Sequence, residues 1–122
     1  MKALRTAAAL ATTLIVLPQA AMAFEGRYLN KRGGMEQEAT ITRRPGGDYK
    51  VVLDVAVRGC IGSFEGVGVS RKDSLLAQAH DPDDGGCKIT IRKTRNGIAV
   101  KEDACSYWHG AACEFSGNYR KK

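Results

Sequence analysis

The stretch DYKVVLDVAVRGC, residues 48–60, decides the fold of this chain. Its apolar and polar side chains alternate, with Lys50, Asp54 and Arg58 lying between the apolar positions. The apolar positions are Tyr49, Val51, Leu53, Val55 and Val57. A period of two is typical of a β-strand with one buried and one solvent-facing side. We therefore predict a strand here, in a sheet that is covered on one face only.

The same alternation recurs along most of the chain, and turn signals separate the runs. The further positions predicted to face inward are Ala39, Ile41, Ile61, Val67, Val69, Leu75, Ala77, Ala79, Cys87, Ile89, Ile91, Ile98 and Val100. The turn signals are at 31–34, 44–48, 71–73, 81–86 and 94–97. With a strand at each end of the domain, the sequence predicts an all-β fold, an eight-stranded antiparallel meander closed into a small barrel. Closure leaves the sheet without exposed edges.

The first and last of these strands share the pattern F-x-G-x-Y, in FEGRY at 24–28 and in FSGNY at 115–119. FEGVG at 64–68 is a partial third copy. A glycine between two side chains on the same strand face leaves room for a neighbouring aromatic ring or for a bend. We interpret the two full copies as the strands that pair to close the barrel, with a duplicated ligand site as the alternative.

The first 23 residues have the features of a secretory signal peptide. Lys2 and Arg5 precede an apolar run at 7–17, and Ala21 and Ala23 occupy the small positions of a cleavage site. The apolar run is shorter than the roughly 20 residues that cross a bilayer. We predict a signal peptide at 1–23, no membrane anchor, and one exported domain at 24–122, located in the periplasm.

Charge gives little support for a nucleic-acid partner. The whole chain has a net charge of +6, and loss of Lys2 and Arg5 lowers it to +4. A nucleic-acid-binding arm is expected to contain a longer run of basic residues than this chain has. We interpret the basic side chains as a solvated surface and expect no nucleic acid to bind.

Four cysteines in a small exported chain indicate two disulfides. A zinc site is not expected, because the paired C-x-x-C spacing is missing. In a meander, Cys60 and Cys87 each begin a strand, two strands apart, so both starts lie at the same end of the barrel. Among the three possible pairings we favour Cys60–Cys87 and Cys105–Cys113, the second fixing a local loop.

The acidic segment DPDDGG begins like a calcium loop, with Asp81, Asp83 and Asp84. An EF-hand would continue with a ligand at the fifth position and a bidentate glutamate at the twelfth, where this chain has Gly85 and Arg92. A turn at a hairpin tip explains the segment better. We expect no metal and no cofactor.

A catalytic triad is also not indicated. Only His80 and His109 could act as the base, and no nucleophile motif accompanies either of them. We therefore do not expect an enzyme.

The loop between Cys105 and Cys113 is the best candidate for a binding surface. It contains Ser106, Tyr107, Trp108 and His109, and tyrosine and tryptophan are common anchors of protein interfaces. A disulfide at its base would reduce the entropy lost on binding. In one interpretation these side chains face a partner. In the other, Trp108 folds back as a plug over one end of the barrel and His109 caps a turn.

The ending CSYWHGAACEFSGNY resembles a C-x-x-[YW]-H-G-x-x-C-x-F-x-G-x-Y pattern of exported bacterial domains, some of them linked with lysozyme-inhibitor modules. In plan, residues 24–122 are similar to the periplasmic inhibitors of C-type (animal) lysozyme. That resemblance implies an eight-stranded barrel that inserts a loop into the lysozyme cleft. The family's S-G-x-x-Y motif is matched by Ser116, Gly117 and Tyr119, with one residue fewer before the tyrosine.

The resemblance makes inhibition of C-type lysozyme the leading hypothesis for function. Animal lysozymes are generally basic, so a positively charged inhibitor needs a contact face that is locally neutral or acidic. Asp81, Asp83 and Asp84 could help to supply it, and Ser116 is a further contact candidate. The alternative is a periplasmic binding or adhesion domain for another protein or for a small ligand.

Overall fold

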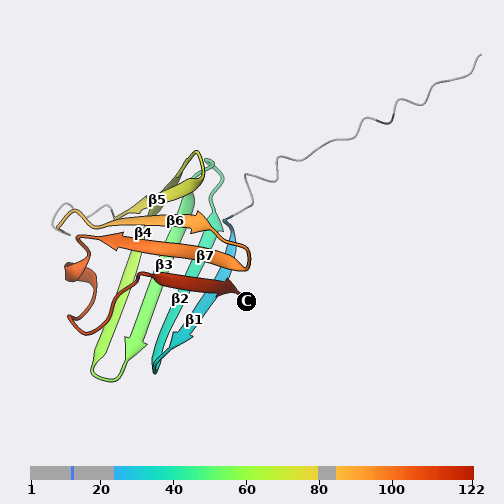
Figure 1. Cartoon of the computed structure of the whole chain (residues 1–122). Coiled ribbons are helices and arrows are strands. Elements are labelled where there is room, and N and C mark those ends of the chain that lie inside the picture. Colours follow the sequence, from blue (N-terminus) through green and yellow to red (C-terminus); the bar gives the residue numbers. More distant parts are fainter. Residues whose placement is uncertain (1–11, 13–23, 80–84) are drawn as a thin grey trace, which may run out of the picture.

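The fold is described from a computed structural model, which covers residues 12, 24–79 and 85–122. Within these ranges, eight antiparallel strands form a closed barrel in which neighbours in sequence are neighbours in the sheet (Figure 1). The strands are β1 (Gly26–Arg32), β2 (Met35–Arg43), β3 (Tyr49–Val57), β4 (Cys60–Arg71), β5 (Ser74–Gln78), β6 (Lys88–Lys93), β7 (Gly97–Asp103) and β8 (Gly117–Lys121). The predicted fold class is confirmed. The predicted signal peptide lies outside the described residues, apart from Thr12.

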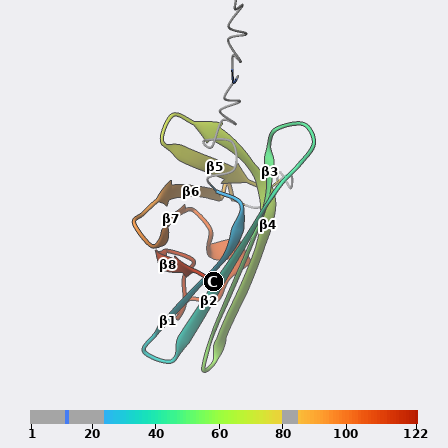
Figure 2. The same cartoon turned by 90° about the vertical axis from the view of Figure 1, so that its right-hand side faces the viewer.

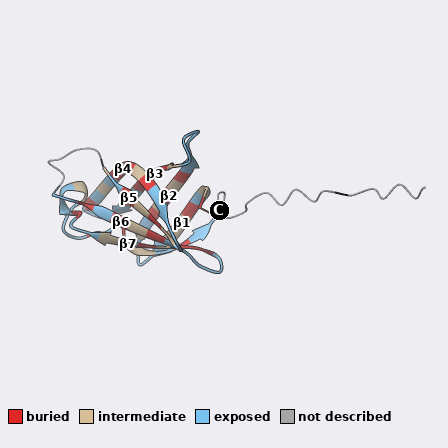
Figure 3. Cartoon of the chain, turned by 90° about the horizontal axis from the view of Figure 1, so that it is seen from above, coloured by how far each residue is buried: buried red, intermediate tan, exposed pale blue. Residues whose placement is uncertain are grey.

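The interior of the barrel is filled by side chains that point inward at every second position. Tyr49, Val51 and Leu53 of β3 are at most 1% exposed, while Lys50 and Asp54 on the opposite face of the strand are exposed. Figure 3 shows the buried positions along the strands. The largest buried side chains are Tyr28, Tyr49, Tyr119, Phe64 and Phe115. Burial of these rings contributes to the hydrophobic stabilisation of this small domain.

The two F-x-G-x-Y strands close the barrel, as predicted. β1 pairs with β8, with Tyr28 opposite Lys121. In each copy the tyrosine hydroxyl donates to the carbonyl oxygen of the phenylalanine four residues earlier, at 3.0 Å from Tyr28 to Phe24 and at 2.7 Å from Tyr119 to Phe115. The repeat therefore has a structural function, because the hydrogen bond satisfies a buried phenol at each side of the seam.

The prediction of which face of β4 points inward is wrong. Ile61 is 77% exposed and Val69 is 51% exposed. Phe64 points inward instead, and because the strand alternates, Gly66 and Gly68 share its face. A Cβ at Gly66 would lie 2.7 Å from the Phe64 ring. The two glycine positions therefore add no apolar side chain to the inward pattern, and at Gly66 the Phe64 ring already fills the space.

The predicted disulfide pairing is also wrong. Cys60 is bonded to Cys113, and Cys87 to Cys105, with Cα atoms 5.9 Å and 4.4 Å apart. Cys60 and Cys87 do begin strands at the same end of the barrel, as expected. The other two cysteines flank the β7–β8 connection at that end too, so the end that each cysteine occupies does not determine its partner.

The register of neighbouring strands explains which cysteines pair. β6 and β7 form a hairpin in which Lys88 lies opposite Asp103. Cys87 directly precedes Lys88 and Cys105 lies two residues after Asp103, so their bond ties the two strands together just beyond the end of the hairpin. Cys113 is left to reach the start of β4, where it fastens the β7–β8 connection to the barrel wall.

Candidate functional site

The loop of residues 105–113, here the Trp108 loop, covers a free edge of the barrel. It contains a short 3-10 helix, η2 (Ser106–Trp108). β5 pairs with β4 only from Val67 to Arg71, so the first half of β4 lacks a partner from β5. The Trp108 loop takes that place: the amide of Gly110 donates to the carbonyl oxygen of Ile61 at 3.2 Å. It is therefore part of the barrel wall as well as a surface loop.

A glycine on β4 allows this close approach. Gly62 forms an isolated antiparallel bridge with His109. A Cβ at Gly62 would lie 2.3 Å from the Cβ of His109 and 2.9 Å from the carbonyl oxygen of Trp108. Any larger residue would push the Trp108 loop away from the barrel, so the position of the loop depends on Gly62.

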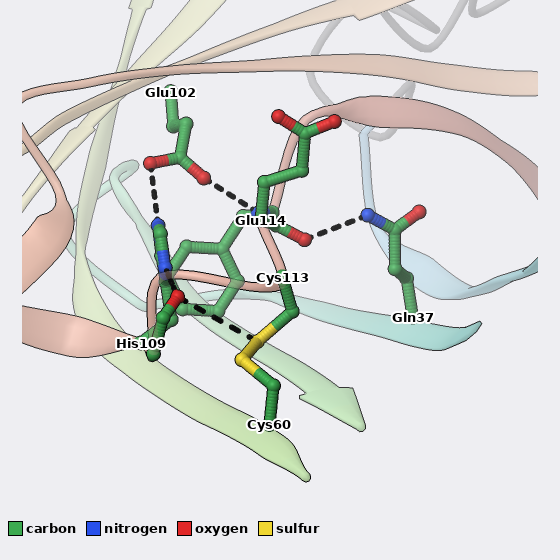
Figure 4. The surroundings of a disulfide bond; sticks show 8 residues. Gln37, Cys60, Glu102, His109, Cys113 and Glu114 are labelled. Atoms are coloured by element: carbon green, nitrogen blue, oxygen red, sulfur yellow. Dashed lines mark hydrogen bonds and ion pairs between the residues drawn. A yellow bond between two sulfur atoms is a disulfide. The ribbon is translucent and has the colours of Figure 1, made fainter. Parts of the chain in front are cut away.

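His109 fastens the loop from its other side. Its Nε2 lies 2.7 Å from Oε2 of Glu102 on β7, and its Nδ1 lies 2.6 Å from the carbonyl oxygen of Gly110 (Figure 4). The second oxygen of Glu102 accepts a hydrogen bond of 2.6 Å from the amide of Phe115. The imidazole edge also contacts the Phe115 ring, with centroids 5.2 Å apart.

These contacts favour the protonated form of His109. Burial of the ring opposes protonation, but the hydrogen bond to Glu102, the contact with the Gly110 carbonyl and the charges of Glu102 and Glu114 together raise the pKa of His109. Both ring nitrogens face acceptors, and only the imidazolium can donate from both. His109 therefore acts as a charged clamp between the loop and β7.

The three aromatic residues of the loop divide between the core and the surface. Trp108 packs edge to face on Phe64, with ring centroids 5.5 Å apart. Tyr107 is 63% exposed and contacts only the Trp108 ring among the ring contacts of the described residues. Within the loop, Tyr107 therefore faces outward, Trp108 packs against the core, and His109 is the clamp. Ser106 is exposed at the start of η2.

Ser116 is held by a backbone contact, since its Oγ accepts a hydrogen bond of 2.9 Å from the amide of Glu102. The side chain joins β7 to the segment before β8. It is half-buried and lies next to the clamp, not on the exposed part of the Trp108 loop.

Gln37 is a site residue that the sequence analysis missed. It is fully buried, and its Nε2 donates to the carbonyl oxygens of Glu114 at 2.8 Å and Ser116 at 3.0 Å. Its Oε1 accepts a hydrogen bond of 2.7 Å from Asn30. The alternation on β2 could have revealed it, because Gln37 shares the parity of Ala39. Gln37 ties the segment after the Trp108 loop to the barrel interior.

A shallow groove of about 580 Å³ lies beside the loop, on the outer face of β1 to β4. Its walls include three carboxylates, from Glu36, Glu38 and Asp54, together with Ile61 and Trp108. We call it the acidic groove. Glu36, Glu38, Asp54 and Ile61 occupy outward positions of their strands, so the alternation that buries the core also brings these side chains to the groove.

The carboxylates of the acidic groove are only partly compensated. Glu38 pairs with Arg27, whose hydrogen bond lowers the pKa of Glu38, and Glu36 lies 3.3 Å from Lys31. Asp54 accepts a hydrogen bond of 2.9 Å from Ser63 and has no cationic partner among the described residues.

Of the predicted contact residues, Asp81, Asp83 and Asp84 lie outside the described residues. Within residues 12, 24–79 and 85–122, no group of three or more His, Cys, Asp or Glu side chains is placed to hold a metal ion. The same residues include no helix long and apolar enough to cross a membrane. Two disulfides in one small domain are typical of exported proteins.

Comparison with protein-family models, with curated proteins and with solved structures finds no match to this chain.

Proposed function

We propose that this chain binds and inhibits C-type lysozyme, with the Trp108 loop and the acidic groove as its contact surface. The observation that carries the proposal is that an exposed tyrosine on a cross-linked loop stands beside a groove walled by carboxylates. Protein interfaces commonly combine a rigid aromatic anchor with a rim of complementary charge.

The charge of the groove weakens an electrostatic objection. A basic lysozyme would be repelled by the net charge of +6 on this chain if that charge were spread evenly. Glu36, Glu38 and Asp54 lie together on one side of the barrel. Because Arg27 and Lys31 pair with two of these carboxylates, this side is close to neutral and repels a positively charged partner less than an evenly spread charge would. It also presents Ile61 and Trp108.

The loop supplies the groups that a lysozyme cleft can accept. The cleft holds two carboxyl groups, and Tyr107 and Ser106 carry exposed hydroxyl donors. In Figure 1 the loop stands out from the barrel on the side away from the C terminus. The Cys60–Cys113 bond, the His109 clamp and the Gly62 contact all hold it in place, so little order has to be gained on binding.

The packed interior supports a protein partner over a small ligand inside the barrel. Five fully buried aromatic rings occupy the space that a ligand-binding barrel of eight strands would leave open. The groove on the outer face is shallow, as is common for surfaces that bind proteins.

A turbidity assay tests the proposal. Residues 24–122 with both disulfides formed are mixed with hen egg-white lysozyme at equimolar and at ten-fold excess, and bacterial cell-wall lysis is followed. We expect lysis to fall at equimolar protein and to be restored by Tyr107→Ala. Unchanged lysis at ten-fold excess contradicts inhibition. Binding without inhibition, measured by calorimetry, would instead support a binding domain for a basic protein.

A further inference from the structure

The up-and-down topology gathers one set of connections at one end of the barrel. The β2–β3, β4–β5 and β6–β7 turns and the C-terminal end of β8 all lie at the end opposite to the disulfides. The registers agree, since Ser74 lies opposite Arg92 and Gly97 lies opposite Arg120. In Figure 2 the β2–β3 and β4–β5 turns stand at the top, and the β1–β2 and β3–β4 turns at the bottom.

This end, here the basic end, carries exposed cations from separate elements. They come from the β4–β5 turn, the end of β6, the β6–β7 turn and the C terminus. These residues are Arg71, Lys72, Lys93, Arg95, Lys121 and Lys122. Among the described residues, none of the six has a carboxylate within ion-pair distance. Their positive charge is therefore available to a partner.

The few acidic side chains at this end are largely engaged. Asp48 lies 3.2 Å from Arg44, and Glu25 accepts a hydrogen bond of 3.2 Å from the amide of Arg43. Among the described residues, Asp73 in the β4–β5 turn is the remaining side-chain carboxylate near these cations, and it lines a surface hollow together with Arg71, Lys72 and Arg92. The cations outnumber the free acids, so the basic end attracts anions.

Two of these cations, Lys93 and Lys121, repel each other. Partial burial, and then the charge of Lys121, lower the pKa of Lys93. Lys93 ends β6 and Lys121 ends β8, so this repulsion acts between different strands. An anion bound between them would relieve it, as opposite charge favours the charged form of a lysine.

We propose that the basic end adsorbs to a membrane surface that carries anionic phospholipid headgroups. Its cations are spread over several turn tips and are not gathered around one pocket, which fits an extended layer of phosphates better than a single small anion. The turns present Pro45, Gly46, Gly47, Asp73, Thr94 and Asn96 besides the cations. None of these is a large apolar side chain that could insert, so the attraction is electrostatic and salt weakens it.

This orientation leaves the Trp108 loop facing away from the membrane. The loop and both disulfides lie at the opposite end of the barrel, where a second protein could still reach them. The proposal is independent of lysozyme inhibition, because it involves different residues and a different partner.

Vesicle co-sedimentation tests the proposal on the oxidised domain, residues 24–122. The probes are vesicles of phosphatidylcholine alone and vesicles with about 30% phosphatidylglycerol. We expect binding to the anionic vesicles only, with a steady fall as sodium chloride increases. Each cation near such a surface contributes roughly five-fold in partitioning. The variant Arg71→Gln/Lys72→Gln/Arg95→Gln should therefore lose roughly one hundred-fold.

A matched variant removes the same charge elsewhere. Arg58 and Lys88 lie at the disulfide end and Lys101 on the side of β7, and all three are exposed. Arg58→Gln/Lys88→Gln/Lys101→Gln should lose less than about five-fold. Equal losses in both variants would overturn the proposal, since net charge alone would then explain binding. Three results for the wild type would also overturn it: no binding to anionic vesicles, equal binding to neutral vesicles, or binding only to soluble polyphosphate. All three are measured on the wild type, so they do not require any variant to fold.

Discussion

The two ends of the barrel are built on the same strands, but their connections are held in different ways. At the basic end, short turns close with backbone hydrogen bonds, such as 2.8 Å from the Arg44 amide to the Asp48 carbonyl oxygen and 2.9 Å from the Thr94 amide to the Gly97 carbonyl oxygen. At the disulfide end, the β7–β8 connection leaves the sheet and is fastened by two covalent bonds. The difference shows that hairpin turns need only the correct local residues, whereas a long connection needs long-range ties before it can present a fixed surface.

The largest test of this comparison removes the bond that fastens the Trp108 loop. Cys60→Ser with Cys113→Ser opens a sequence separation of 53 residues, and the chain-entropy relation predicts a loss of about 4 kcal/mol in the free energy of unfolding. Cys87→Ser with Cys105→Ser removes the bond with a sequence separation of only 18 residues, and the free energy of unfolding should fall by about 3 kcal/mol. Urea unfolding of both variants measures the difference. A larger loss from the shorter separation would contradict this account of the loop.

A second test is applied at the basic end. A Cβ at Gly97 would lie 1.9 Å from the carbonyl oxygen of Tyr119, so Gly97→Ala must push β7 and β8 apart. We expect a loss of about 2 kcal/mol. Gly46→Ala is the control, because a Cβ there meets nothing within 4 Å. Thermal unfolding should separate the two variants, and similar melting temperatures would show that the pairing of β7 with β8 tolerates the extra methyl group.

A third test compares neighbouring residues within the Trp108 loop. Trp108→Ala removes a ring that packs on Phe64 and should cost about 2 kcal/mol, less than for a fully buried tryptophan. Tyr107→Ala should cost less than about 0.5 kcal/mol, because its side chain is mostly exposed. Chemical unfolding measures both. Equal losses would contradict the division of the loop into a core-facing and a solvent-facing residue.

The smallest expected effect is a pH dependence of stability at the disulfide end. The pKa of His109 is raised in the folded state, so its stabilising contribution is complete below the ordinary histidine value of about 6.5. That contribution is lost as the pH rises through the folded-state pKa. Stability measured from about pH 5.5 to about pH 8.5 should therefore fall more in the wild type than in His109→Gln. His80 is present in both proteins, so the difference between their pH dependences reports on His109. Parallel curves of stability against pH would contradict the charged clamp.

Much of the fold could be predicted because alternation is a local signal. Tyr49, Val51 and Leu53 on β3 identify their inward face without any knowledge of neighbours. The F-x-G-x-Y repeat likewise indicated that β1 and β8 pair. The prediction for β4 failed where this signal is weak, since Gly66 and Gly68 occupy inward positions and leave their space to Phe64 and Leu75.

The candidate site was predictable only in part. The composition of the Trp108 loop indicated its importance, but the direction of each side chain depends on partners far away in sequence, such as Phe64 and Glu102. The disulfide pairing depends on the register between β6 and β7, which alternation alone does not give. Gln37 could have been identified from its parity on β2, whereas its acceptors could not.

The most direct test of the proposed contact surface is the dissociation constant for C-type lysozyme, measured by calorimetry for three proteins. The wild type is compared with Tyr107→Ala at the disulfide end and with Arg95→Gln at the basic end. Loss of an aromatic anchor should weaken binding by at least about ten-fold, while Arg95→Gln should bind within about two-fold of the wild type. Equal binding by Tyr107→Ala and the wild type would contradict the claim that the Trp108 loop is the contact surface.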